Sequence, residues 1–129
     1  MKPETQEFIA YALKLLADAE KMLESELPDH AARTCYLACF HVARAYSFER
    51  GAHPGKTHRG VQSEFFRLSK DDERVDPQLR AFLTTAYAFK ATSDYSTGPD
   101  DTPTETEARA AVEAARRFVA QFVALTPRQ

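Results

Sequence analysis

The sequence has no tryptophan, and it is poor in the residues that staple or punctuate small proteins, with 2 cysteines and 4 glycines among 129 residues. Its net charge is -2, so neither DNA nor an anionic membrane is expected as a partner, and any contact with RNA would need a local basic patch. No run approaches the roughly 18 apolar residues of a membrane span, and the first residues lack the apolar segment of a signal peptide. We therefore expect a cytoplasmic protein.

The two cysteines, Cys35 and Cys39, are four residues apart in one helical pattern. A disulfide between them would strain the helix, so we expect free thiols in a reducing compartment, where they serve as small core side chains. A zinc site would need two further ligands, and the nearest histidines, His30 and His41, fall off the face that carries the cysteines. We expect no metal and no cofactor.

Sustained alternation of apolar and polar residues, which marks a strand, is absent, whereas helical periodicity recurs five times. The pattern predicts helices over residues 5–25, 30–50, 57–68 and 77–95, and a last one that starts in the segment 102–105. Four long helices and one short one, joined by short loops, favour an all-α antiparallel up-and-down bundle. The whole chain is most simply one domain, long enough to bury about two thirds of its unfolded surface.

Local signals indicate where these helices begin and end. Asp29 is expected to be the N-cap of the second helix, and Gly51 is expected to stop it. Asp76, which a proline follows, is expected to cap the fourth helix. The last helix is expected to start with a capping box that pairs Thr102 with Glu105.

The loop GAHPGKT, residues 51–57, is close to the phosphate-binding loop of nucleotide triphosphatases. Arg50 stands where the first glycine of that motif would be, however, and a helix precedes the loop where a strand should. The triphosphatase hypothesis is therefore rejected. What remains is a cluster of Lys56, His58 and Arg59 at the start of the third helix, where free backbone N–H groups favour anions. The cluster is either a solvated basic turn or a contact for phosphate or RNA.

The second helix is apolar nearly all the way round, apart from one polar stripe of Arg33, Thr34, His41 and Arg44. Arg33 and Arg44 are almost three helical turns apart, so they point the same way. A buried arginine without a partner would be costly. The stripe therefore either forms salt bridges with acids of the first, fourth or fifth helix, or lines a polar groove that meets a ligand or a partner chain.

Near the end of the fourth helix, Lys90 and Asp94 stand four residues apart and share a side with Tyr87. Such a pair contributes only about 0.2–0.5 kcal/mol to helix stability when it is exposed. Taken alone, it is an ordinary surface pair.

Two segments together resemble a known family. They are AARTCYLACFHVARAYSFERGAHPGKTHRGVQSEF, residues 31–65, and LRAFLTTAYAFKATSDYSTG, residues 79–98. They are similar to the HEPN domain, a small helical domain found in prokaryotic toxin–antitoxin and nucleotidyltransferase-linked proteins, and within it to an uncharacterised subgroup. The most specific pieces are residues 36–44 and 56–61.

The resemblance implies a bundle of four to five helices that commonly dimerises, with the fourth helix lining a cleft at the dimer interface. Many HEPN members are metal-independent ribonucleases that use an arginine followed, after four to six residues, by a histidine. Others lack this motif and serve as binding or assembly modules, often beside a minimal nucleotidyltransferase. We therefore expect a homodimer, with a nucleotidyltransferase or an antitoxin as partner and RNA or a nucleotide as ligand.

The chain departs from that nuclease motif. None of His30, His41, His53 and His58 has an arginine five to seven positions before it, and Lys90 stands where relatives keep an arginine. Lysine retains the positive charge but lacks the planar fork of donors that grips a phosphate. The usual general acid–base for attack by a ribose 2′-hydroxyl is missing, so no catalytic residue is expected.

We therefore interpret the chain as a HEPN-like binding or assembly module whose polar cleft takes RNA, a nucleotide or a partner protein. The residues expected to line the cleft are Arg33, His41, Arg44, Lys90, Asp94 and Tyr95. The alternative is a metal-independent endoribonuclease toxin, in which an arginine of the stripe and Lys90 hold phosphate and His41 or Tyr95 moves the proton. A third hypothesis is a structural subunit that masks or positions a nucleotidyltransferase.

Overall fold

Five helices make up the part of the chain that the computed structural model describes, residues 1–53, 57–95, 98 and 102–127. They are α1 (Pro3–Glu24), α2 (Pro28–Glu49), α3 (His58–Ser69), α4 (Pro77–Tyr95) and α5 (Glu105–Leu125). Within these ranges there is no strand, and no helix combines the length and apolarity that crossing a membrane requires. The predicted all-helical fold is confirmed, and α3 is the short helix.

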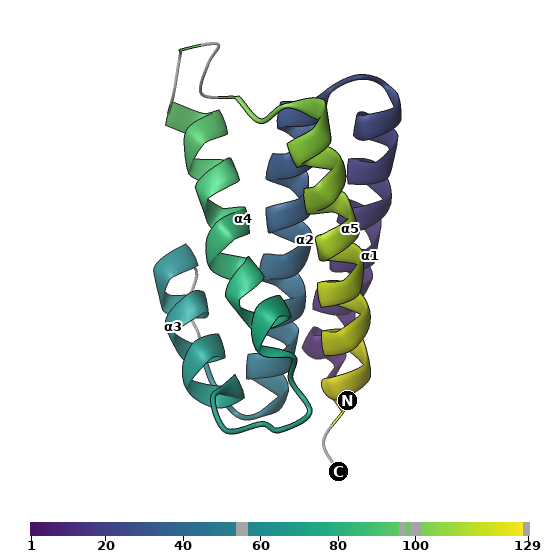
Figure 1. Cartoon of the computed structure of the whole chain (residues 1–129). Coiled ribbons are helices and arrows are strands. Elements are labelled where there is room, and N and C mark those ends of the chain that lie inside the picture. The colour runs from purple at the N-terminus through teal and green to yellow at the C-terminus, as the bar shows by residue number, and fades with distance from the viewer. Residues whose placement is uncertain (54–56, 96–97, 99–101, 128–129) are drawn as a thin grey trace.

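Helix α2 is the centre of the bundle. Figure 1 shows the four long helices side by side, with α1 and α4 running in one direction and α2 and α5 in the other, and α2 packs against each of the other four helices. The close approach is possible because many of its buried residues are small, including Ala31, Ala38, Cys39, Ala43 and Ala45. Beyond its first turn, the stripe of α2 that stays partly exposed consists of Arg33, Leu37, His41, Arg44 and Phe48.

The core between α2, α3 and α5 is aromatic. Phe65 is fully buried, and its ring centroid lies 5.8 Å from that of Tyr46, 5.8 Å from that of Phe118 and 4.9 Å from that of Phe122. Cys35 is fully buried as a free thiol, and burial raises its pKa to about 12. The thiol is therefore a protonated core side chain at neutral pH, as its position in the sequence predicts.

The ends of the early helices match the sequence prediction in part. Asp29 is not the N-cap of α2, because the helix already begins at Pro28 and Asp29 lies in its first turn. Proline is favoured as the first helical residue, since its φ is fixed and its missing N–H removes no helical bond. Gly51 follows the end of α2 with φ 87°, a left-handed conformation that suits glycine. Asp76 caps α4 by accepting a hydrogen bond from the N–H of Gln78 at 2.9 Å.

The capping box of α5 lies two residues later than the sequence suggests. Thr104, and not Thr102, is the N-cap: its hydroxyl accepts a hydrogen bond from the N–H of Glu107 at 3.1 Å. The carboxylate of Glu107 accepts one in return from the N–H of Thr104 at 3.1 Å. Two of the unpaired N–H groups at the start of the helix are satisfied in this way.

Replacing Thr104 by alanine is expected to lower the free energy of unfolding by about 1 kcal/mol, because it removes the side chain that caps α5. Urea denaturation followed by circular dichroism measures this change. Thr106→Ala is the matched control, since Thr106 is an exposed threonine in the first turn of the same helix. Equal losses in the two variants would contradict the assignment of the cap to Thr104.

Candidate functional site

Two cations from different helices meet at one carboxylate near the end of α4. Arg33 of α2 donates its Nε–H to Oδ1 of Asp94 at 2.7 Å, and Lys90 donates to Oδ2 at 2.6 Å. Lys90 and Asp94 stand one turn apart, with side chains only 13% and 23% exposed. The bonds from Lys90 and Arg33 hold the pKa of Asp94 below its ordinary value. We call Arg33, Lys90 and Asp94 the Asp94 cluster.

His58, the first residue of α3, lies within electrostatic reach of this cluster. Partial burial lowers its pKa, Lys90 and Arg33 lower it further, and Asp94 opposes them. The hydroxyl of Thr57 caps α3 by accepting a backbone hydrogen bond at 3.0 Å, which fixes where the helix begins and so where His58 stands. His58, one residue of the predicted basic turn, therefore lies near the end of α4, although the two are far apart in the sequence.

The ring of His58 is surrounded by aromatic side chains and held by one hydrogen bond. Its Nδ1 lies 2.7 Å from the hydroxyl oxygen of Tyr36, to which Nε2 of Gln62 donates at 3.2 Å. The ring centroids of Phe40 and Tyr87 lie 4.6 Å and 5.9 Å from that of His58. Tyr36 is fully buried, and this burial raises its pKa. Residues of α2, α3 and α4 together therefore fix the imidazole.

The other three members of the predicted stripe face α1, and the hydroxyl of Thr34 donates to the sulfur of Met22 at 3.3 Å. The guanidinium of Arg44 lies over the ring of Phe8, 4.3 Å from its centroid, and the ring of His41 lies 4.8 Å from that of Tyr11. Burial first, and then Arg44 and His58, lower the pKa of His41 to about 4. Its Nδ1 is buried without a hydrogen-bond partner among the described residues. The stripe is thus divided between the Asp94 cluster and the contact with α1.

Two of the remaining predicted residues, Tyr95 and Arg59, are exposed. Tyr95 is 82% exposed, and Nζ of Lys90 lies 5.9 Å from the centroid of its ring. Arg59 is exposed and follows His58 in the chain. Lys56 lies outside the described residues.

Tyr36 and Gln62 are not predicted as site residues from the sequence. Tyr36 opens the most specific piece of the family resemblance, which is a signal, but on a helix that is apolar nearly all round it is indistinguishable from a core residue. No local sequence pattern marks Gln62 as a site residue, because its contact with Tyr36 joins residues 26 apart in the chain. Tyr87 is noted only for its place one turn before Lys90.

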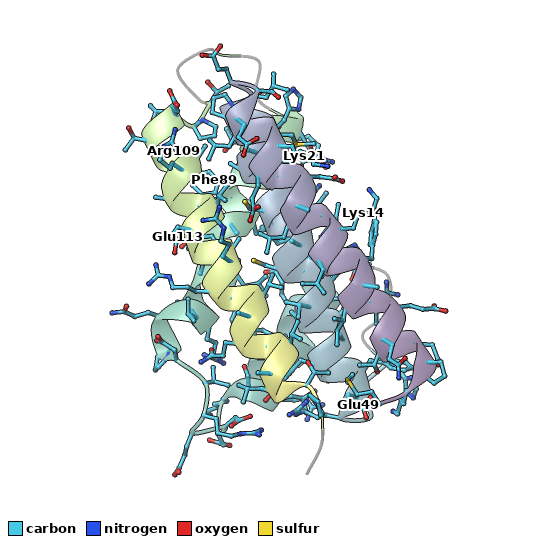
Figure 2. All side chains as sticks on the ribbon, turned by 90° about the vertical axis from the view of Figure 1, so that its right-hand side faces the viewer. Lys14, Lys21, Glu49, Phe89, Arg109 and Glu113 are labelled. Carbon is cyan, nitrogen blue, oxygen red and sulfur yellow. The ribbon has the colours of Figure 1, made fainter. Side chains whose placement is uncertain are left out.

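Surface hollows elsewhere in the molecule do not contain these groups. One of about 630 Å³ lies beside Asp72 and Arg80, and two of about 430 and 280 Å³ lie between α1 and α5, where both include Arg109 and Arg116. Figure 2 shows the face of the bundle formed by α1 and α5, with Arg109 on α5. Groups of three or more histidine, cysteine or acidic side chains that could hold a metal do not occur in the part of the chain described.

Comparison with known proteins agrees with the resemblance drawn from the sequence. The HEPN domain family model matches residues 5–124. A curated protein of Methanocaldococcus jannaschii, named "Putative toxin", is 29% identical over 94 residues, which cover 73% of this chain and 63% of that protein. The chain thus spans less than two thirds of that relative's length. Because the family match extends over nearly the whole sequence, the chain belongs to the HEPN domain family.

Proposed function

We propose that the chain is a HEPN binding module that holds the phosphate of an RNA or a nucleotide at the Asp94 cluster without cutting it. The observation that carries the proposal is the convergence of Arg33 and Lys90, from two helices, on one carboxylate. Two positive charges face one negative charge there, so the cluster is net positive although the chain carries -2. This is the local patch that an acidic protein needs to contact a nucleic acid.

Arg33 is placed to grip a phosphate. It uses only its Nε–H on Asp94, and within the described ranges its two Nη groups have no hydrogen-bond partner. Its side chain is 37% exposed. A guanidinium fork matches the geometry of phosphate oxygens, and Lys90 adds a point charge beside it. A phosphate can therefore bind the Nη groups while the bond between Arg33 and Asp94 persists.

The same site lacks a ready pair of groups for proton transfer. Cleavage by a ribose 2′-hydroxyl needs a general base and a general acid within hydrogen-bond reach of the reacting atoms. His41 is neutral and packs against α1, and Nδ1 of His58 is already bonded to Tyr36. These observations support binding without cleavage.

The biological setting that we propose is a pair of proteins of the toxin–antitoxin kind. The name of the Methanocaldococcus jannaschii relative, "Putative toxin", supports it. We propose that the chain acts in the cytoplasm as a homodimer, with an antitoxin or a minimal nucleotidyltransferase as its protein partner.

One observation favours a second candidate, a metal-independent endoribonuclease toxin. His58 lies within electrostatic reach of Lys90 and Arg33, so a histidine is present beside two cations even though the arginine–histidine motif is absent. In this alternative Arg33 and Lys90 hold the phosphate and His58 moves the proton.

The test combines binding and cleavage by the purified protein. We expect a fluorescently labelled single-stranded RNA to bind, to remain intact in the presence of EDTA, and to bind less tightly to Lys90→Ala. The slope of log affinity against log salt should fall by about 0.7, the value of one lost phosphate contact on a single strand. Arg109→Ala is the control, because Arg109 belongs to an exposed pair with Glu105 on α5 and its removal gives the same change in net charge.

Two results would contradict phosphate binding without cleavage. Cleavage that persists in EDTA and disappears in His58→Ala would establish the ribonuclease. If RNA binds neither the wild type nor any variant, and Lys90→Ala abolishes capture of a protein encoded beside this one, the ligand is a partner protein and the phosphate proposal is wrong.

A further inference from the structure

A buried hydroxyl determines where the proton of His58 lies. An amide nitrogen only donates, so the oxygen of Tyr36 accepts from Gln62 at 3.2 Å. The other partner of this hydroxyl in the described residues is Nδ1 of His58 at 2.7 Å. If the hydroxyl group did not direct its proton toward Nδ1, a fully buried O–H group would lack an acceptor, which is unfavourable. Tyr36 therefore donates to His58.

This bond fixes the tautomer of the imidazole. A neutral histidine carries one N–H, and because Nδ1 accepts the bond from Tyr36, that N–H is on Nε2. The ring geometry directs Nε2 away from the buried hydroxyl. Within the described ranges Nε2 has no hydrogen-bond partner, and it is not among the enclosed atoms that lack one. It is therefore an accessible donor.

The surroundings also disfavour a positive charge on His58. Protonation would place a proton on Nδ1 and break the bond from Tyr36, while Lys90 and Arg33 already act against it. The titratable and charged groups that face the ring are Arg33, Tyr36 and His41 of α2 and Tyr87, Lys90 and Asp94 of α4. Asp94 alone favours the charged form, and its carboxylate is shared between two cations.

We infer that His58 is a neutral ligand-binding donor whose Nε2–H contacts a phosphate oxygen held at the Asp94 cluster, and that Tyr36 is the positioning residue that fixes this tautomer. The inference rests on the proposed function and extends it. Such a donor needs an acceptor, and an oxygen of an ionised phosphodiester is a strong acceptor at neutral pH. Because Nδ1 accepts the bond from Tyr36 and Nε2 carries the hydrogen, neutral His58 has no free lone pair with which to abstract a proton.

The tautomer can be measured without any ligand, by NMR of histidine side chains labelled with 15N. We expect wild-type His58 to give the pattern of the neutral Nε2–H form at pH 7 and above, because its pKa is lowered from the ordinary value of about 6.5. Tyr36→Phe should mix the tautomers and raise the pKa of His58. Tyr46→Phe is the matched control, since Tyr46 is also fully buried and donates a single bond, to Asp72 at 2.9 Å. An Nδ1–H pattern in the wild type, or the same spectrum in both variants, would overturn the assignment.

Three substitutions of His58, together with Tyr36→Phe, then test the contact with the labelled RNA. His58→Ala should weaken binding about tenfold, the usual effect of losing a hydrogen bond to a charged group. His58→Gln, whose amide nitrogen reaches the position of Nε2, should restore most of the affinity, whereas His58→Asn, which imitates Nδ1, should not. In Tyr36→Phe the affinity should become pH-dependent, whereas the wild type changes little over the same range.

Failure of this inference differs from failure of the proposed function. If the wild type binds RNA and His58→Ala binds it equally well, the histidine contact is wrong while the Asp94 cluster stands. If the wild type binds no RNA, both are wrong as far as the ligand is concerned, and the NMR measurement still decides the role of Tyr36.

Discussion

Phe65→Ala is expected to lower the free energy of unfolding by about 3–5 kcal/mol, the range for removing a large aromatic side chain from a packed core. Phe65 is fully buried, and besides its chain neighbour Phe66 three aromatic rings of other helices lie within 6 Å of its own, centroid to centroid: Tyr46, Phe118 and Phe122. These residues come from α2 and α5, so the cavity would open where α3 joins the rest of the bundle. A domain of this size is stable by about 5–15 kcal/mol, so the loss is a large part of the total.

Phe66→Ala provides the matched control for this prediction. Phe66 is the next residue along α3, is only partly buried, and has the guanidinium of Arg80 at 4.9 Å from its ring centroid. Its removal leaves a smaller cavity, so we expect a loss of about 1–2 kcal/mol. Urea denaturation of both variants measures the difference, and a loss at Phe65 no greater than that at Phe66 would contradict the central place of the aromatic core.

Helical periodicity was enough to predict the elements, because each long helix carries an apolar stripe that must be buried. The starts of the helices were harder. Thr102 and Thr104 are each followed three residues later by a glutamate, so both satisfy the pattern of a capping box. The local sequence does not distinguish the two registers. In the structure Pro103 is buried ahead of the helix, so packing against the bundle determines that Thr104 is the N-cap.

The candidate site was predictable only in part, for a related reason. The i, i+4 pair of Lys90 and Asp94 can be read from the sequence, but the third member of the cluster, Arg33, is 61 residues from Asp94. Two hypotheses for the stripe, salt bridges or a polar groove, remained open because one helix cannot show which neighbour it meets. The structure gives Arg33 an acid on α4 and gives Arg44 an aromatic ring on α1.

The position of His58 illustrates the same limit. Its neighbours in the chain are compatible with either a solvated basic turn or a contact for phosphate or RNA. Its contacts with Tyr36 and Tyr87 depend on how α3 packs against α2 and α4, and no local pattern encodes that packing. Spacing motifs in the sequence detect chemistry carried by one element, whereas this site is assembled from three.

Asp94→Asn is expected to increase the affinity for single-stranded RNA at low salt by about tenfold. In the wild type Asp94 neutralises one of the two positive charges of Arg33 and Lys90, and its negative charge repels a phosphate bound beside them. Without the carboxylate, one more positive charge is left unneutralised about 6 Å from the phosphate. At an effective dielectric constant of about 40, its attraction contributes about 1.4 kcal/mol to binding, which is tenfold in affinity. Fluorescence polarisation over a salt series measures this gain, which should shrink as salt rises.

The same substitution is expected to destabilise the fold by about 1–2 kcal/mol, since it leaves Lys90, whose side chain is 13% exposed, without its carboxylate. Stability and binding thus move in opposite directions. Lower stability together with higher RNA affinity is expected if Asp94 only positions the two cations. A carboxylate that contacts the ligand itself would give lower affinity when it is replaced.

Glu113→Gln provides the control for net charge. Glu113 pairs with Arg116 on α5, and Figure 2 shows it on the face of α5 and α1. This variant gains the same unit of charge, so any general increase in attraction to RNA appears in both variants. Only the additional gain in Asp94→Asn is due to the Asp94 cluster.

If Asp94→Asn weakens binding instead, Asp94 itself contacts the ligand, through a sugar hydroxyl or a base amine, and the two cations are not the phosphate site. If it strengthens binding no more than Glu113→Gln does, the RNA binds elsewhere, because a phosphate held by Arg33 and Lys90 would necessarily sense the loss of the charge between them.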